Sequence, residues 1–183
     1  MIKIIRRLSF FILIVLQMVF LLAIFFDRID TPIILTFIIG VSLLISFAYF
    51  KAPRDEEEHF IEDVYLILFA VIGAVITFYL NTQLKLGPII SASLVGFLGS
   101  FSPLINKKSE ILKELPAAMY CGSFVGMTSL QVAPDIEFIL FAGFIAGTIL
   151  MLSKNIFNGF GGKLGTVAFG GVAITSVIIY ILF

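Results

Sequence analysis

The segment NGFGGKLGTVAFGG, residues 158–171, combines glycines with a lysine, which are the residue types that hold phosphate groups in nucleotide-binding loops. A P-loop requires G-x-x-x-x-G-K-[ST], because its amides and lysine bind phosphates and its hydroxyl binds the metal. Here Phe157 stands in place of the first glycine and Leu164 in place of the hydroxyl residue. Leu164 also replaces the last glycine of a dinucleotide fingerprint that would start at Gly159. The spacing therefore argues against a nucleotide site.

The same glycines have a second use at the start of a helix. Gly159, Gly161 and Gly162 permit an irregular backbone, and the free amides of the following helix start attract anions. Lys163 adds a positive charge, and Lys85 does the same before another apolar segment. We predict that Lys85 and Lys163 are entrance charges for an anion or a polar solute; a flexible turn with an interfacial lysine is the alternative.

Small and hydroxyl-bearing residues form stripes in three apolar segments. Ser93, Gly96 and Ser100 share one helical face because their spacing is i, i+3, i+7. We predict that such stripes line a narrow passage, whereas close helix packing through small-x-x-x-small patterns is the alternative. The other predicted lining residues are Gly122, Gly126 and Ser129 in the second segment, and Thr166, Gly170 and Thr175 in the third.

Residues for covalent or metal chemistry are scarce. His59 is the single histidine and Cys121 the single cysteine, so a two-histidine metal site and an internal disulfide are excluded within one chain. A G-x-S-x-G nucleophile motif is absent. We therefore expect no enzyme, no cofactor and no metal site, and we expect Cys121 to be a small apolar side chain in a helix contact.

Composition identifies the elements that must position these residues. Of the 183 residues, 60% are hydrophobic and 13% charged, against about 25% charged in soluble domains; the mean hydropathy is +1.15. Continuous apolar runs exclude the alternation of a membrane β-barrel and approach the length that crosses a bilayer. We predict an all-α polytopic membrane protein of about seven helices in one domain, 1–183. The runs cover 8–26, 31–50, 64–80, 87–105, 116–134, 136–152 and 164–183, with Pro32, Pro88, Pro116 and Pro134 near helix starts.

Lysine and arginine predict the orientation. If alternate connections lie on alternate sides, ten of the 12 Lys and Arg residues share one side, and only Arg28 and Lys85 lie on the other. Positive residues concentrate in the cytoplasm. We therefore expect a multi-pass protein of a bacterial-type inner membrane, with the N-terminus cytoplasmic and the C-terminus outside.

An inverted duplication is a further hypothesis. DVYLILFAVIGAVITFYL, from Asp63, and DIEFILFAGFIAGTILML, from Asp135, match at seven positions with an offset of 72, and K-L-G follows each of them. A shift of three helices reverses the orientation, as in transporters with inverted repeats. The units would be a first helix, 1–30, followed by repeats 31–105 and 116–183. The helices expected at 31–50 and 116–134 show no convincing match.

Charged residues are absent from the seven apolar cores, which disfavours carboxylate-driven proton coupling. We expect Asp63, Asp135 and Glu137 to be solvated charges at helix ends. Gln17 is the main polar residue of the first run, and we expect it to hydrogen-bond another helix.

These patterns favour a small channel or transporter for a small polar or anionic solute, with its passage along the fourth, fifth and seventh helices. The alternative is a non-transporting membrane subunit for assembly or signalling, whose glycines serve helix packing alone. Besides the lipid bilayer, a second copy of the chain is an expected partner through the G-x-x-x-G faces Gly122–Gly126 and Gly143–Gly147. No nucleic-acid partner is expected.

Overall fold

The computed structural model describes residues 2–27, 29–51, 62–154 and 162–182, which form helices and no strands. The all-α prediction is therefore confirmed for these residues. The elements are α1 (Ile2–Asp27), α2 (Pro32–Lys51), the 3-10 turn η1 (Glu62–Val64), α3 (Tyr65–Thr82), α4 (Pro88–Ser100), α5 (Ser102–Ile105), α6 (Glu110–Gly126), α7 (Ile136–Leu152) and α8 (Lys163–Leu182).

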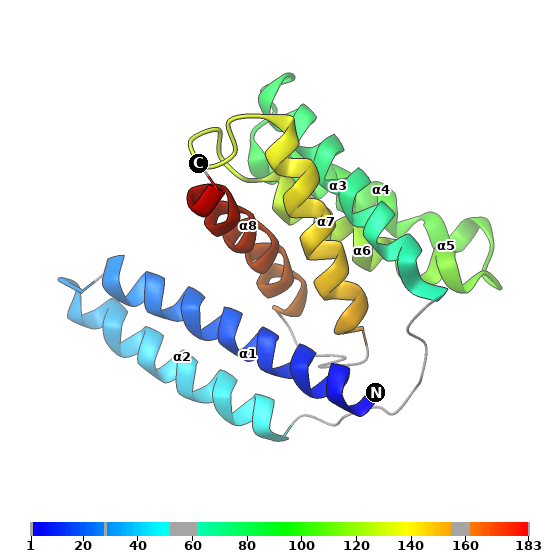
Figure 1. Cartoon of the computed structure of the whole chain (residues 1–183). Coiled ribbons are helices and arrows are strands. Elements are labelled where there is room, and N and C mark those ends of the chain that lie inside the picture. The colour runs from blue at the N-terminus through cyan, green and yellow to red at the C-terminus, as the bar shows by residue number, and fades with distance from the viewer. Residues whose placement is uncertain (1, 28, 52–61, 155–161, 183) are drawn as a thin grey trace.

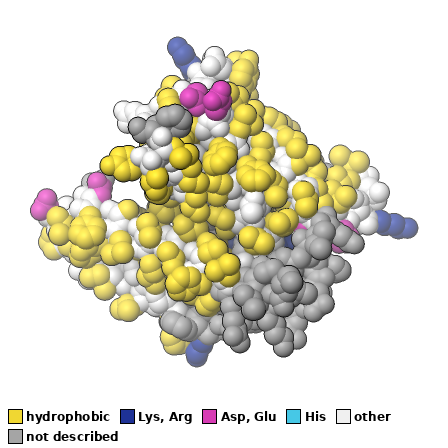
Figure 2. Space-filling view, in the orientation of Figure 1, with side chains coloured by type: hydrophobic (Ala, Val, Ile, Leu, Met, Phe, Trp, Pro, Cys, Tyr) yellow, Lys and Arg dark blue, Asp and Glu magenta, His cyan; other side chains and the backbone are white. Residues whose placement is uncertain are grey.

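Four stretches of the described helices are long and apolar enough to cross a membrane: Leu8–Asp27, Tyr65–Thr82, Pro88–Ile105 and Lys163–Leu182. Pro32–Phe47 and Ile136–Leu152 are apolar but shorter. Hydrophobic side chains cover much of the described surface in Figure 2, where charged side chains show only in small groups. These features support a membrane protein, although they do not by themselves establish seven crossings.

The centre of the fold is α3, which packs against both α6 and α7 (Figure 1). On the outside, α4 covers α6 and α8 covers α7. The hairpin of α1 and α2 lies to one side, where α1 contacts α7 and α8. Among the described elements α2 contacts α1 alone.

The contact between α3 and α6 depends on glycine. A Cβ added to Gly122 would overlap the carbonyl oxygen of Ala70, and one added to Gly126 would overlap that of Ala74. The two backbones therefore touch directly, as small-x-x-x-small patterns permit. From the pair Gly122–Ala70 to the pair Gly126–Ala74 the residue number rises in both helices, so α3 and α6 run parallel.

An adjacent face of α3 packs against α7 in the same manner, but the two helices run in opposite directions. A Cβ on Gly147 would lie 2.6 Å from the Cα of Ile67, and one on Gly143 would lie 3.2 Å from the Cα of Val71. As the residue number rises in α7 it falls in α3, so these two helices are antiparallel. The start of α3 therefore lies beside the end of α7.

Helix α6 corrects two predictions. The helix expected at 116–134 begins instead at Glu110 and ends at Gly126, so that Pro116 lies inside it and Ser129 lies in the turns that follow. The start is set by Ser109, whose side chain accepts a hydrogen bond from the amide of Leu112. The first turns of α6 are polar, and the search for apolar runs therefore passed over them.

Pro116 leaves a carbonyl without its helical partner. Since proline has no N–H, the carbonyl of Leu112 cannot receive the usual i to i−4 hydrogen bond. The buried hydroxyl of Ser102 donates to this carbonyl at 3.0 Å. Ser102 is the first residue of α5. The expected helix 87–105 breaks at Phe101, directly before Ser102 and Pro103. The hydroxyl of Ser102, at the helix break, thus replaces the hydrogen-bond donor that Pro116 lacks in α6.

We predict that Ser102→Ala lowers the free energy of unfolding by about 1 kcal/mol, because the part-buried Leu112 carbonyl loses its donor. Pro116→Ala restores an amide that can bond this carbonyl, so Ser102→Ala should cost clearly less in that background. Chemical denaturation of the four variants in detergent forms a double-mutant cycle. Additive effects of the two substitutions would contradict the proposed coupling.

We predict that Gly122→Ala lowers the free energy of unfolding by about 1–3 kcal/mol, because its methyl group would overlap the backbone of α3. Gly165→Ala is the matched control within α8, since nothing lies within 4 Å of a Cβ at that position. This control should be neutral or stabilising, because alanine favours the helix. Equal losses in both variants would show that helix propensity, not contact with α3, explains the effect.

Candidate functional site

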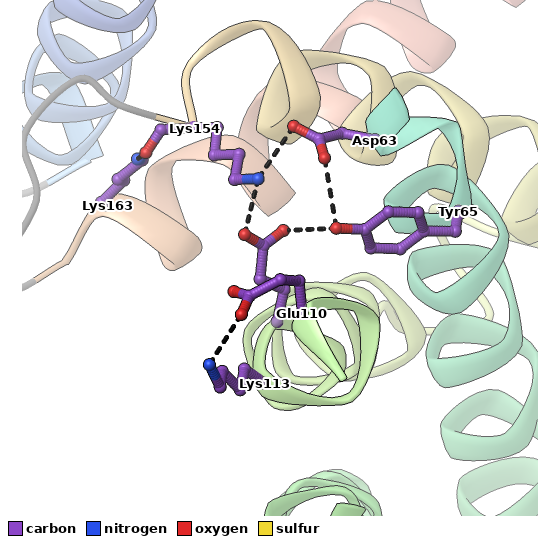
Figure 3. Close-up of polar contacts among 7 residues, drawn as sticks. Asp63, Tyr65, Glu110, Lys113, Lys154 and Lys163 are labelled. Atoms are coloured by element: carbon purple, nitrogen blue, oxygen red, sulfur yellow. Dashed lines mark hydrogen bonds and ion pairs between the residues drawn. The ribbon is translucent and has the colours of Figure 1, made fainter. Parts of the chain in front are cut away.

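Charged side chains meet at the end of the bundle where α3 and α6 begin and α7 ends (Figure 3). Asp63, in η1, is only 3% exposed. Lys154 follows the end of α7, and its Nζ lies 2.8 Å from Asp63 Oδ2 and 2.5 Å from Glu114 Oε1 of α6. One ammonium group thus joins two carboxylates from different parts of the chain.

Tyr65 completes a closed set of contacts from the first turn of α3. Its Oη lies 2.8 Å from Glu114 Oε2 and 3.1 Å from Asp63 Oδ1. Asp63, Tyr65, Glu114 and Lys154 therefore form a ring in which every neighbouring pair is in contact; we call it the ion-pair ring. It ties together the starts of α3 and α6 and the end of α7.

The ring keeps Lys154 charged. Burial by itself lowers the pKa of Lys154, but the hydrogen bonds and negative charges of Asp63 and Glu114 outweigh it, so the pKa is raised above its ordinary value of 10.5. The stability that comes from this shift is fully present below the ordinary pKa and is lost as the pH rises through the raised value. The lysine is therefore a fixed cation at physiological pH.

The burial of Asp63 contradicts the prediction that it is a solvated charge at a helix end. Its partner Lys154 is 91 residues away in the chain, so local sequence could not reveal the pair. By contrast Asp135 and Glu137 are exposed as expected, and Asp135 accepts a hydrogen bond from the amide of Phe138 at the start of α7. Buried Asp63 needs Lys154 as a partner, because an isolated carboxylate is costly to bury.

Lys163, one of the two predicted entrance charges, lies close to the ring (Figure 3). Its Nζ donates to the backbone carbonyls of Ser153 at 2.6 Å and of Lys154 at 2.8 Å. Carbonyl groups at the C-terminal end of a helix have no N–H partner within the helix. Lys163, the first residue of α8, donates the missing hydrogen bonds to the two carbonyls that directly follow α7. The other predicted entrance charge, Lys85, is exposed in the turn before α4.

The glycine-rich segment is described only in part. Gly159 and Gly161 lie outside the described residues, whereas Gly162 directly precedes α8 with φ at 87°. Gly87 directly precedes α4 with φ at 84°. Both helices thus follow a glycine in a conformation that other residues rarely adopt.

The predicted lining residues of α4 and α6 face different surroundings. Ser93 and Ser100 are exposed on α4. Gly96 faces the ring of Tyr120, where the two helices touch. Gly122 and Gly126 contact α3, as described above, and Ser129 is exposed.

The predicted lining residues of α8 contact α1 or form hydrogen bonds within α8 itself. The Thr166 hydroxyl donates to Gln17 Oε1 at 2.6 Å, which confirms the predicted helix-to-helix bond of Gln17. Gly170 faces Leu16, and the Thr175 hydroxyl bonds the carbonyl of Gly171. The described structure therefore does not gather the predicted lining residues around one space, and their role as a lining stays a prediction.

Sequence reasoning missed Tyr65, Glu114 and Lys154 as members of one site. A signal was present, because the orientation rule places the start of the third expected helix, the connection before the fifth and the end of the sixth on one side. That rule groups connections but does not pair individual side chains.

Comparison with known proteins identifies no relative: no family model, no curated protein and no solved structure matches the chain. The class that the fold of the described residues supports is an all-helical protein with apolar helices suited to a membrane and a partly buried ion-pair ring at one end of its bundle.

We predict that Lys154→Met lowers the free energy of unfolding by about 1–3 kcal/mol, because two carboxylates lose their counter-ion. This range lies below the usual value for buried pairs, because Lys154 is 23% and Glu114 26% exposed in their side chains. Lys113→Met is the control, since it removes an exposed pair with Glu110 on the same helix. Denaturant midpoints in detergent measure both, and equal changes would contradict a special role for Lys154.

Proposed function

We propose that this chain is a small membrane transport protein for a small polar or anionic solute. All seven long helices would cross a bacterial-type inner membrane, with the N-terminus cytoplasmic and the C-terminus outside. The observation that carries the proposal is the ion-pair ring, in which buried Asp63 meets the partly exposed Glu114 and Lys154, in a chain with extensive apolar surface. In membrane proteins, ionisable groups inside the helix bundle often mark ion or solute pathways, and the ring lies at one end of this bundle, where such a pathway would begin.

Helix directions support the proposed crossings of the bundle. Lys163 at the start of α8 contacts the carbonyls at the end of α7, so these two helices are also antiparallel. Together with parallel α3 and α6 and antiparallel α3 and α7, this is the alternation that successive crossings require. Lys154 and Lys163 lie at the end that the positive-inside rule assigns to the cytoplasm.

The packing of α3 favours a carrier over a permanently open channel. Gly122 and Gly126 contact the backbone of α3 directly. A passage lined by these glycines would open only when α3 and α6 separate. Such a separation is a change between two packed states, which is how carriers alternate access.

A second candidate is a non-transporting membrane subunit for assembly or signalling. The same contacts favour it, because close packing against α3 is a sufficient reason for the glycines of α6 and α7. Ser93 and Ser100 would then lie on the exposed side of α4, where another subunit, including a second copy, would bind.

We predict that the purified chain in liposomes transports small anions or polar solutes, and that Lys163→Gln lowers anion flux at least tenfold because an entrance cation is lost. Lys163→Arg should retain most of the flux, since arginine keeps the charge. Lys51→Gln is the control, because Lys51 is an exposed lysine at the end of α2, a helix that contacts α1 alone among the described elements. Size-exclusion chromatography of each variant reports whether it is folded.

Two outcomes would contradict the transport proposal. If the folded wild-type chain gives no flux across a broad panel of anions and neutral solutes, the transport proposal is contradicted and the subunit candidate is favoured. Flux that is unchanged in a folded Lys163→Gln variant would show that Lys163 is not an entrance charge.

A further inference from the structure

The hydroxyl of Thr77 in α3 differs from the other threonine hydroxyls of the described helices. Thr77 is fully buried, and its Oγ1 is the buried side-chain polar atom that has no hydrogen-bond partner among the described residues. A threonine inside a helix commonly donates to the carbonyl four residues earlier. The threonines that do so here are Thr36, Thr82, Thr148, Thr166 and Thr175. A buried hydroxyl without a partner is unfavourable, so the position of Thr77 needs a reason.

Thr77 lies at the end of the direct contact between α3 and α6. It shares one face of α3 with Ala70 and Ala74, because the spacing is i, i+4, i+7. A Cβ added to Gly126, the last residue of α6, would lie 2.7 Å from the Cβ of Thr77. Since α3 continues to Thr82, α6 ends before its neighbour does, and the polar side chain stands at this step.

The ion-pair ring holds the opposite end of the bundle. Thr77 follows Tyr65 by twelve residues, which is about 18 Å along a helix. In the described part of the chain, side-chain bonds that join α3, α6, α7 and α8 lie at the ring and at Lys163 and Leu164, where α8 begins. The helices near Thr77 are held by packing, and they can separate there while the ring keeps the other end closed.

The chemistry around Thr77 suits an uncharged polar group. A threonine hydroxyl both donates and accepts a hydrogen bond, as the hydroxyl and amide groups of small solutes also do. The helix ends on this side of the bundle carry Lys85, Asp135 and Glu137, which are exposed and of both signs. An anion would meet no excess of positive charge there, and burying a charge without a counter-ion is costly.

We propose that the Thr77 hydroxyl binds the polar group of a small uncharged solute, which enters between α3 and the end of α6 from the side opposite the ion-pair ring. The site rests on the proposed function, and it takes the uncharged class of the solutes considered there. In the packed bundle the hydroxyl has no partner, whereas in the separated state it bonds the solute. The solute therefore favours the separated state, because it interacts better with that state.

Unfolding in detergent tests the packed state without any solute. Thr77→Val keeps the shape of the side chain and removes its hydroxyl, so it should lower the equilibrium constant of unfolding about fivefold or more. Thr175→Val is the matched control, because Thr175 is equally buried but donates to the carbonyl of Gly171. If Thr77→Val is no more stable than Thr175→Val, the hydroxyl has a partner in the packed bundle and the proposal is overturned.

Thiol labelling tests entry from one side. In a Cys121→Ser background, Thr77→Cys should react with a membrane-impermeant thiol reagent added on the side where α6 ends. Thr175→Cys in the same background should not react, although Thr175 is buried to the same degree. Reaction of both variants, or of neither, would overturn the proposed entry.

Glycerol uptake into liposomes separates this proposal from the transport function. Thr77→Val should lower glycerol flux at least tenfold, and Thr77→Ser, which keeps a hydroxyl, should retain most of it. Unchanged glycerol flux in folded Thr77→Val, or a wild-type chain that transports anions but not glycerol, would overturn the site alone. A wild-type chain that transports no solute would overturn the proposed function, and the site would fall with it.

Discussion

Direct backbone contact of α3 with both α6 and α7 is the constraint on which the arrangement of the bundle depends. Gly122 and Gly126 of α6 touch one face of α3, and Gly147 of α7 touches an adjacent face. In a lipid environment apolar side chains gain little by leaving lipid for protein, so close packing of this kind must provide much of the attraction between helices. The spacing of these contacts also sets how far each helix is shifted along its neighbour.

The ion-pair ring is a consequence of that shift. Because α3 and α6 run parallel with Ala70 opposite Gly122, Asp63 and Glu114, seven and eight residues earlier, lie at nearly the same level, and antiparallel α7 ends there as well. Asp63, Glu114 and Lys154 can therefore meet although they are distant in the chain. Each of these charges alone would be unfavourable beside apolar helices, so the packing and the ring depend on each other.

Apolar runs predicted the helices well but their polar ends poorly. The run at 136–152 coincides with α7, whereas α6 begins six residues before Pro116, because Ser109 and Glu110 start it with polar turns that hydropathy does not detect. The glycine stripes were recognised, but whether a glycine meets a neighbouring backbone or open space, as Gly122 and Gly165 do, depends on the fold. The ring could not be predicted, since pairing Asp63 with Lys154 requires knowledge of the level at which each helix lies.

The packing also bears on the suspected duplication. The matched residues Ala70 and Ala142 both present a carbonyl oxygen to a glycine, Gly122 for the first and Gly171 for the second. A shared need for small residues at such contacts would produce similar sequences in α3 and α7 without common descent. An inverted repeat would further place α2 against α7 as α6 lies against α3, but α2 contacts only α1 among the described elements. Close packing therefore accounts for the matches directly, whereas the contact between α2 and α7 that the duplication hypothesis predicts is absent among the described elements.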